Sequence, residues 1–151
     1  MADSNSLDNE LYNYIFDYTG PVDMLFIGME CVGAPISWLY GPLFSKPLNR
    51  EHDKSRRLSG SNCSKALEIV KRSGCKEVCV YAMGMEPWLG YIMAVDYKPD
   101  SLPIVESEKL IDFCRAQDLK AERLFGKKEW IFSNGKYQSK TLEQESIVTA
   151  L

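Results

Sequence analysis

Leu25-Phe-Ile-Gly-Met-Glu-Cys-Val-Gly-Ala-Pro35 is the stretch of sequence that decides the fold of this chain. The short apolar run Asp23–Ile27 follows a Gly20-Pro21 turn, and this pattern predicts a buried strand. Glu30 stands two residues beyond Gly28. A carboxylate just past the carboxyl end of a buried strand lies where open α/β sheets carry their chemistry. The alternative is a surface glutamate in a loop, which is the more common environment for this residue type.

A second buried strand is predicted at Glu77–Ala82, after a helix at Asn62–Ser73 that Gly74 ends. The preceding Ser59-Gly-Ser61 is expected to cap that helix. Strand, helix and strand form a βαβ-like unit, in which the two strands are parallel neighbours. The second strand ends in the turn Met83–Trp88, which contains Glu86. We therefore expect Glu30 and Glu86 at the same edge of the sheet, with their Cα atoms less than about 20 Å apart, roughly four strand spacings.

The flanking segments give further element predictions. Ser6–Tyr18 is predicted as a helix that Ser6 or Asp8 caps, because apolar residues recur there at helical spacing. These residues are Leu7, Leu11, Tyr14, Ile15 and Tyr18. The later predicted elements are a helical turn at Pro87–Val95, an amphipathic helix at Ile104–Gln117, strands at Ala121–Phe125 and Glu129–Phe132, and a hairpin return at Lys136–Gln138 after the Asn134-Gly135 turn. On the amphipathic helix, Val105, Leu110, Ile111, Phe113 and Cys114 can face inward.

Ala34–Leu48 is apolar but contains three prolines and a glycine, so no long regular element is expected there. It is also too apolar for a free loop. We interpret it as a lid over a pocket, with Trp38 and Tyr40 as lid residues, or as a surface that another part of the protein covers. Trp88 is expected to form a wall of the same pocket.

Length and charge narrow the class of protein. The chain of 151 residues is long enough for one domain, and its net charge of -3 gives no indication of a nucleic-acid or membrane partner. We do not expect the polar, acidic N-terminus to be a signal peptide. The five cysteines are interpreted as reduced thiols, and Cys75 and Cys79 as buried hydrophobic residues, not zinc ligands. We expect a cytoplasmic location, or the plastid stroma.

Acidic residues are the most informative candidates for chemistry. The chain has one histidine, His52, no visible Ser-His-Asp or Cys-His set, and no P-loop. Glu30, Asp53 and Glu86 follow strands or helices of one βα layer. Carboxylates gathered at one sheet edge can hold a hard cation such as iron or manganese, or act as acid and base.

Four stretches carry a resemblance to a known superfamily. They are Phe26–Pro35, Ser55–Ser61, Tyr81–Trp88 and Ala121–Trp130. Together they resemble the C-terminal half of a metallo-β-lactamase-fold protein. The branch they resemble most is the diiron oxygenases that hydroxylate the β-carbon of amino acids carried by peptide synthetases. That superfamily has an αββα sandwich built from two similar halves, with metals between the sheets at one edge.

The resemblance implies an α/β fold, half of such a sandwich, with a mixed sheet and helices packed on one face. Residues 1–140 would form this C-terminal domain and residues 141–151 a tail. In the metal site, Glu30 would stand where other branches have a histidine, Asp53 would be the bridging aspartate, and Glu86 would stand at the last ligand position. The complete protein would hold two metal ions, with iron favoured over zinc or manganese. The superfamily's His-x-His-x-Asp-His motif is not present in this chain.

The functional expectation is part of a diiron oxygenase or a dinuclear metallohydrolase that is inactive without its N-terminal half. The alternative is a non-catalytic binding module derived from the same fold, which the lone histidine favours. One layer cannot bury both faces of a sheet, so we expect marginal stability, or a partner on the uncovered face. That partner would be the N-terminal half or a second copy of the chain.

Overall fold

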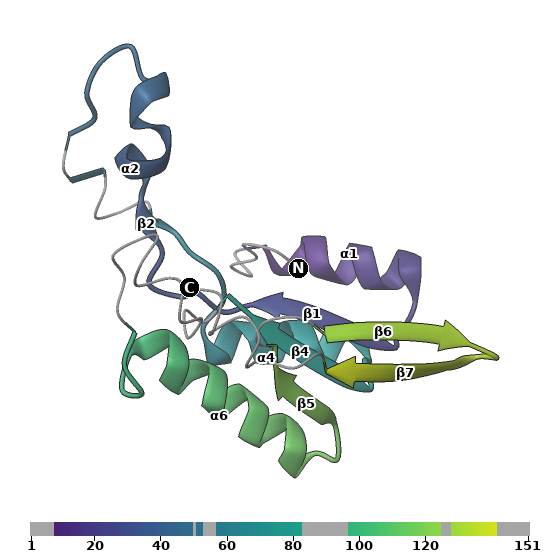
Figure 1. Ribbon diagram of the computed structural model, residues 1–151. Helices are drawn as coiled ribbons and strands as arrows, with labels where there is room; N and C mark the ends of the chain where they lie inside the picture. Colours follow the sequence, from purple (N-terminus) through teal and green to yellow (C-terminus); the bar gives the residue numbers. More distant parts are fainter. Residues whose placement is uncertain (1–7, 50, 53–56, 83–96, 125–127, 142–151) are drawn as a thin grey trace.

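The computed structural model describes residues 8–49, 51–52, 57–82, 97–124 and 128–141. It contains both helices and strands, and the last three described elements are all strands (Figure 1). The helices are α1 (Asn9–Thr19), α2 (Ile36–Tyr40), the 3-10 helix η1 (Gly41–Leu43), α4 (Cys63–Ser73) and α6 (Leu102–Ala116). The strands are β1 (Met24–Gly28), β2 (Ala34–Pro35), β3 (Arg57–Leu58), β4 (Glu77–Tyr81), β5 (Lys120–Arg123), β6 (Lys128–Ser133) and β7 (Lys136–Thr141).

The main sheet has three parallel strands in the order β1-β4-β5. β1 pairs with β4 from Met24 opposite Glu77 to Gly28 opposite Tyr81, so both strands end at the same edge. Helix α4 lies between them in the sequence, and the expected βαβ unit is confirmed. The antiparallel pairs β2–β3 and β6–β7 form two separate small sheets.

Local signals set the ends of the helices. The Asp8 side chain accepts hydrogen bonds from the backbone N–H groups of Glu10 and Leu11 and caps α1. Asn62, not Ser59 or Ser61, caps α4 by accepting from the Lys65 N–H at 3.1 Å. Gly74 ends α4 in the left-handed conformation, as its position in the sequence predicts.

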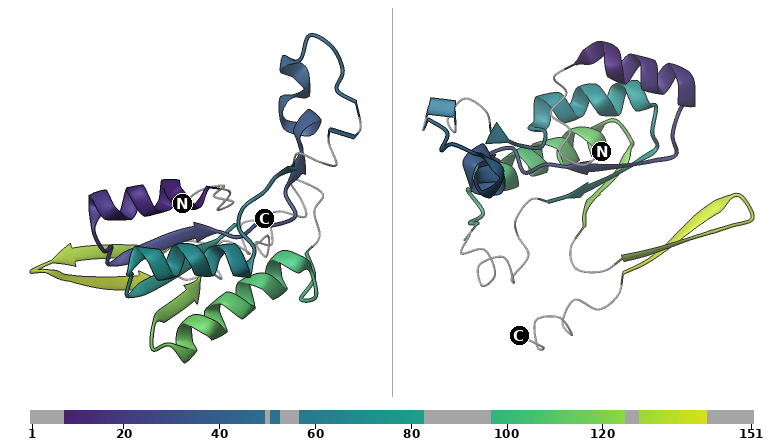
Figure 2. Two further views of the ribbon diagram at one scale, coloured as in Figure 1. Left: turned by 180° about the vertical axis from the view of Figure 1, so that it is seen from behind. Right: turned by 90° about the horizontal axis from the view of Figure 1, so that it is seen from above.

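The hydrophobic core lies between the sheet and helices α1, α4 and α6, which all cover one face of the sheet (Figure 2). Side chains alternate along a strand, so one set from β1 and β4 points into this core. That set is Leu25, Ile27, Val78 and Val80, and it packs with Ala66 and Ile69 of α4 and Leu110 and Ile111 of α6. The expected arrangement of helices on a single face is confirmed.

The hairpin β6–β7 lies on the opposite side of the sheet (Figure 2). Asn134 and Gly135 form its turn with positive φ angles of 52° and 74°, as expected for an Asn-Gly hairpin. Trp130 of the hairpin meets Phe26 of β1 edge to face, with ring centroids 5.2 Å apart. Phe26 is still 37% exposed, so the hairpin covers this face only in part.

Helix α1 forms as predicted, but most of the apolar residues that recur along it do not face the core. Leu11, Tyr14 and Tyr18 are 52%, 69% and 84% exposed, whereas Tyr12 is buried and Phe16 packs against the core. On a short helix that packs against α4, two aromatic residues one turn apart are enough to fix the buried face. On α6, Leu110, Ile111 and Cys114 are buried as expected, but Phe113 is exposed, with Lys71 over its ring.

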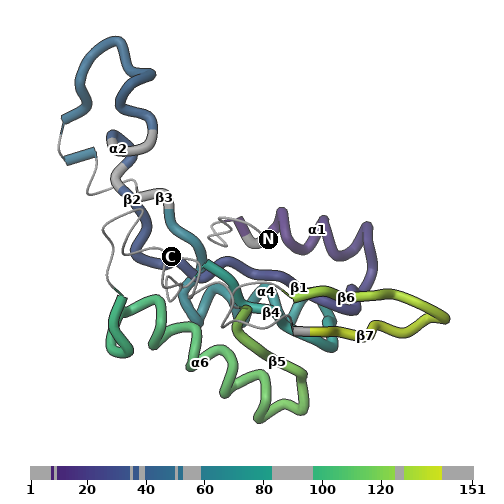
Figure 3. Tube along the Cα trace, in the orientation of Figure 1, coloured from purple at the N-terminus to yellow at the C-terminus, as the bar shows by residue number. Residues whose placement is uncertain are grey.

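The segment after Pro35 projects away from the sheet and its helices (Figure 3). It consists of α2 and η1, so the expected absence of a long regular element is confirmed. Tyr40, Leu43 and Phe44 are exposed on it. Pro87–Val95 and residues 142–151 lie outside the described residues. None of the described helices has the length and apolar character needed to cross a membrane.

Candidate metal-ligand site at the carboxyl edge of the sheet

Glu30 lies at the carboxyl edge of the main sheet, two residues beyond the end of β1. The backbone on both sides of it is fixed. The Met29 N–H donates to the Tyr81 carbonyl at 3.0 Å, which extends the β1–β4 pairing by one residue. The Glu30 carbonyl accepts from the Gly60 N–H at 2.7 Å, and the Gly28 carbonyl accepts from the Ser61 N–H at 3.3 Å. The main chain at Glu30 is therefore held from two directions.

Gly60 makes this close approach possible because it has no side chain. A Cβ atom built at position 60 would lie 2.7 Å from the Gly28 carbonyl oxygen and 3.2 Å from the Glu30 nitrogen. The nearer contact is with backbone, which cannot swing away as a flexible side chain can. The strand end that carries Glu30 thus requires glycine at position 60.

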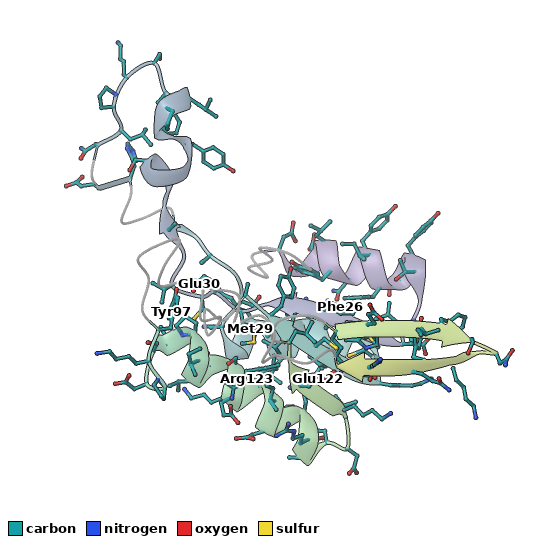
Figure 4. All side chains as sticks on the ribbon, viewed as in Figure 1. Phe26, Met29, Glu30, Tyr97, Glu122 and Arg123 are labelled. Carbon is teal, nitrogen blue, oxygen red and sulfur yellow. The ribbon has the colours of Figure 1, made fainter. Side chains whose placement is uncertain are left out.

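In the part of the chain that the structure describes, three neutral donors hold the Glu30 side chain. Its Oε1 atom accepts from the backbone N–H groups of Val32 at 3.0 Å and Gly33 at 3.1 Å. Gly33 takes a positive φ of 65°, which turns the chain back toward the carboxylate. The Tyr97 hydroxyl donates to Oε2, and Figure 4 shows the two residues together at this end of the molecule. Glu30 is half-buried and oriented at both oxygens.

The neighbouring acidic groups stay protonated at neutral pH. Burial, and then the hydrogen bond to Glu30, raise the pKa of the Tyr97 hydroxyl above its usual range. Burial, and then the charges of Glu30 and Glu106, raise the pKa of the Cys31 thiol. The hydroxyl of Tyr97 therefore acts as a hydrogen-bond donor to Glu30.

Glu106 of α6 caps α4 from outside that helix. Its Oε2 accepts from the backbone N–H of Cys63, the first residue of α4, at 2.9 Å, and its Oε1 accepts from Lys109 at 2.7 Å. The hydrogen bond from Lys109, and then the one from Cys63, lower the pKa of Glu106. This contact ties together the two helices that cover the sheet beside Glu30.

The other predicted site residues lie largely beyond what the structure describes. Asp53, Glu86 and Trp88 are outside the described residues, so their positions relative to Glu30 stay predictions. Trp38 is in α2, but its side chain is also outside them. Tyr40 is exposed on α2. The sequence analysis gave no role to Tyr97, which stands 67 residues after Glu30. Gly60, 30 residues after Glu30, lies in the stretch Ser55–Ser61 that carries part of the resemblance, but its contact with the strand end was not predicted.

A second group of potential ligands lies on the open face of the sheet. Among the described residues, Glu77, Cys79 and Glu122 bring ligand atoms within 4.8 Å of one another. Burial, followed by the charges of Glu122 and Glu77, raises the pKa of Cys79 to about 12. Glu122 is already paired with Lys128, so one of the two carboxylates in this group is not available to a cation. We therefore interpret Glu77, Cys79 and Glu122 as an ion-paired acidic group beside a buried thiol, and not as a metal site.

A hollow of about 420 Å³ lies near this second group, between the sheet and the hairpin. Glu77 and Lys120, the first residues of β4 and β5, line it together with Leu119, which directly precedes β5. Ligand crevices of open α/β sheets lie at the carboxyl ends of the strands, which here is the edge that carries Glu30. The hollow is at the amino end, so it does not complete the Glu30 site.

Comparison with known proteins gives a consistent result. No family profile matches the chain. A curated relative from Streptomyces venezuelae, 4-amino-L-phenylalanyl-[CmlP-peptidyl-carrier-protein] 3-hydroxylase, is 49% identical over 123 residues. These residues are 82% of this chain and 23% of the relative, so the chain spans about a quarter of the length of the protein it matches.

Solved structures agree with this match. The crystal structure of CmlA, a diiron β-hydroxylase from Streptomyces venezuelae, matches 93% of this chain and 25% of its own, with a TM-score of 0.77 and 43% identity. A variant of that enzyme in which a glutamate is replaced by aspartate matches 82% of this chain with a TM-score of 0.70 and 46% identity. The resemblance to the diiron β-hydroxylases of the metallo-β-lactamase superfamily is confirmed, and the chain shares the α/β fold of part of such an enzyme.

Proposed function

We propose that this chain is the part of a diiron β-hydroxylase that contributes Glu30 as a carboxylate ligand of the metal site. The observation that carries the proposal is the Glu30 carboxylate, which is fixed at the carboxyl edge of the sheet by two backbone N–H groups and a hydroxyl. The similarity to diiron β-hydroxylases supports it. By analogy with the curated relative, the substrate class is an aminoacyl group attached to a peptidyl carrier protein.

The residues at this edge fit an iron site. Carboxylate oxygens are hard ligands that iron accepts. Among the described residues, the donors to Glu30 are two backbone N–H groups and a hydroxyl, and none of these three is a cation. Two bound irons would supply the activation of oxygen, while Glu30 holds its position and Gly60 keeps the strand end in place. Asp53 and Glu86 are proposed as further ligands from their places in the sequence.

One rival function follows from a specific observation. The chain contains a single histidine, His52, and it is exposed. A dinuclear site that needs several imidazole ligands cannot be completed by these 151 residues. A non-catalytic interaction module with the same fold would have the same feature. Metal binding separates the two functions.

The test is anaerobic titration with Fe(II) of the chain, alone and together with a histidine-rich first half of a metallo-β-lactamase-type domain. We expect Glu30→Gln to weaken iron binding by at least about tenfold, because a charged ligand is replaced by a neutral amide. Glu122→Gln is the matched control, and its affinity should stay within about twofold. No iron binding in either form, or equal binding by the wild type and Glu30→Gln, would contradict the proposed function.

A further inference from the structure

The side chain of Glu30 has three rotatable bonds, so its direction depends on what holds each oxygen. The N–H groups of Val32 and Gly33 both bind Oε1 and leave Oε2 free to pivot about it. Among the described residues, the Tyr97 hydroxyl is the group seen to bind Oε2. The direction in which Oε2 faces is therefore set by Tyr97.

Tyr97 is itself well anchored. Its ring is half-buried and packs against the core cluster. Lys98, the next residue, begins the turn that leads into α6. Its N–H donates to Ser101 Oγ, and the Ser101 N–H donates to the Lys98 carbonyl, both at 2.8 Å. Pro103 and Ile104, in the first turn of α6, are buried and anchor the start of that helix. The hydroxyl is thus carried by a fixed turn and not by a free loop.

The hydroxyl also suits a site that must remain anionic. A tyrosine donates one hydrogen bond without adding a positive charge, whereas a lysine at the same place would neutralise the carboxylate. Lys128 beside Glu122 shows that second arrangement in the same molecule. The hydrogen bond at Glu30 orients the group and leaves its charge available.

We propose that Tyr97 is a positioning residue of the metal site, which fixes Oε2 of Glu30 and so connects the start of α6 to the ligand at the end of β1. This inference rests on the proposed role of Glu30 as a metal ligand. Substitution of a residue that hydrogen-bonds to a metal ligand typically weakens metal affinity by 10- to 100-fold.

The test uses Tyr97→Phe, which removes only the hydroxyl, with Tyr137→Phe of the hairpin as the matched control. The first readout needs no metal: side-chain relaxation of ¹³C-labelled glutamate, with Glu30 assigned through Glu30→Gln. We expect Glu30 to become mobile in Tyr97→Phe and to be unchanged in Tyr137→Phe. A folded Tyr97→Phe protein whose Glu30 relaxation equals that of the wild type would overturn the inference.

A second measurement covers the case in which Tyr97→Phe does not fold. In the wild type, the hydroxyl proton of Tyr97 should exchange slowly enough to give a signal with a cross-peak to the Glu30 methylene protons. Absence of that cross-peak in the folded wild type would overturn the inference by itself.

Titration with Fe(II) distinguishes the two proposals. We expect Tyr97→Phe to weaken iron binding by about tenfold or more and Tyr137→Phe to leave it unchanged. If Glu30→Gln abolishes binding but Tyr97→Phe changes neither affinity nor relaxation, the positioning role fails and the proposed function stands. If Glu30→Gln has no effect on binding, the proposed function fails and the positioning role fails with it.

Discussion

Glu30 and Glu122 are two half-buried carboxylates on the same three-stranded sheet, and they have opposite kinds of partner. Glu30 stands at the strand end and is held by two N–H groups and a tyrosine hydroxyl. Glu122 stands within β5 on the open face and is paired with Lys128, beside the protonated thiol of Cys79. A carboxylate oriented by neutral donors can still attract a cation, whereas one already paired with lysine is part of the scaffold. This difference separates the two acidic groups although both are close to other potential ligands.

The largest change in stability is expected at Gly60, whose backbone contacts the strand end that carries Glu30. Gly60→Ala should lower the free energy of unfolding by about 2–3 kcal/mol, because the new Cβ would overlap the Gly28 carbonyl. Urea denaturation measures this change. Gly41→Ala is the control, since a Cβ there has no atom within 4 Å, and it should change stability by less than about 0.5 kcal/mol. Equal effects of the two substitutions would mean that the strand end tolerates movement.

The next effect concerns the ion pair on the open face. Lys128→Met should cost about 2 kcal/mol, because it leaves the half-buried Glu122 without its cation. The double variant Glu122→Gln/Lys128→Met should recover most of that loss, which a double-mutant cycle in urea would show. A double variant as unstable as Lys128→Met would contradict the assignment of Glu122 to this pair.

A third prediction concerns the thiol beside that pair. The folded-state pKa of Cys79 is raised from 9.0 to about 12, so the folded state keeps a proton that the unfolded chain loses. Stability from this source is complete below pH 9 and decreases as the pH rises toward the folded value. Between pH 9.5 and 10.5 the loss should be about 1 kcal/mol for this one thiol. Urea midpoints at the two pH values should therefore separate more in the wild type than in Cys79→Val, and equal separations would refute the prediction.

The smallest effect is expected for Asp23 and Lys76, whose side chains are 63% and 82% exposed and lie 3.3 Å apart. Solvent screens such a pair, so Lys76→Met should change stability by less than about 0.5 kcal/mol. A change in thermal midpoint comparable to that of Lys128→Met would show that exposure does not explain the difference between the two pairs.

The sequence predicts the part of this fold that depends on local chemistry and chain order. Asp8, Gly74 and Asn134-Gly135 act within a few residues of themselves, and the structure confirms each signal. The parallel pairing of β1 and β4 follows from the helix between them. The buried face of α1 could not be read in the same way, because Leu11 and Tyr12 are both apolar and only packing against α4 selects between them.

In the candidate site, too, the sequence predicts only what depends on residues close to one another in the chain. The position of Glu30 beyond a strand end is visible in the sequence, because it depends on one short stretch. The role of Tyr97 cannot be predicted from the sequence, because its contact with Glu30 joins a turn before α6 to a strand end 67 residues earlier. No spacing rule connects two such places. The need for glycine at position 60 is not visible in the sequence either, because it arises only where the folded chain brings residue 60 against Gly28.

The cap that Glu106 places on α4 makes one amide a reporter of tertiary structure. The first four N–H groups of a helix have no acceptor within it. The Lys65 amide finds one locally in Asn62, whereas the Cys63 amide depends on a carboxylate from α6, 43 residues away. In hydrogen–deuterium exchange, the Lys65 amide should therefore follow local fraying of α4. The Cys63 amide is protected only while α6 also lies against α4, so its exchange responds to separation of these two helices as well as to fraying.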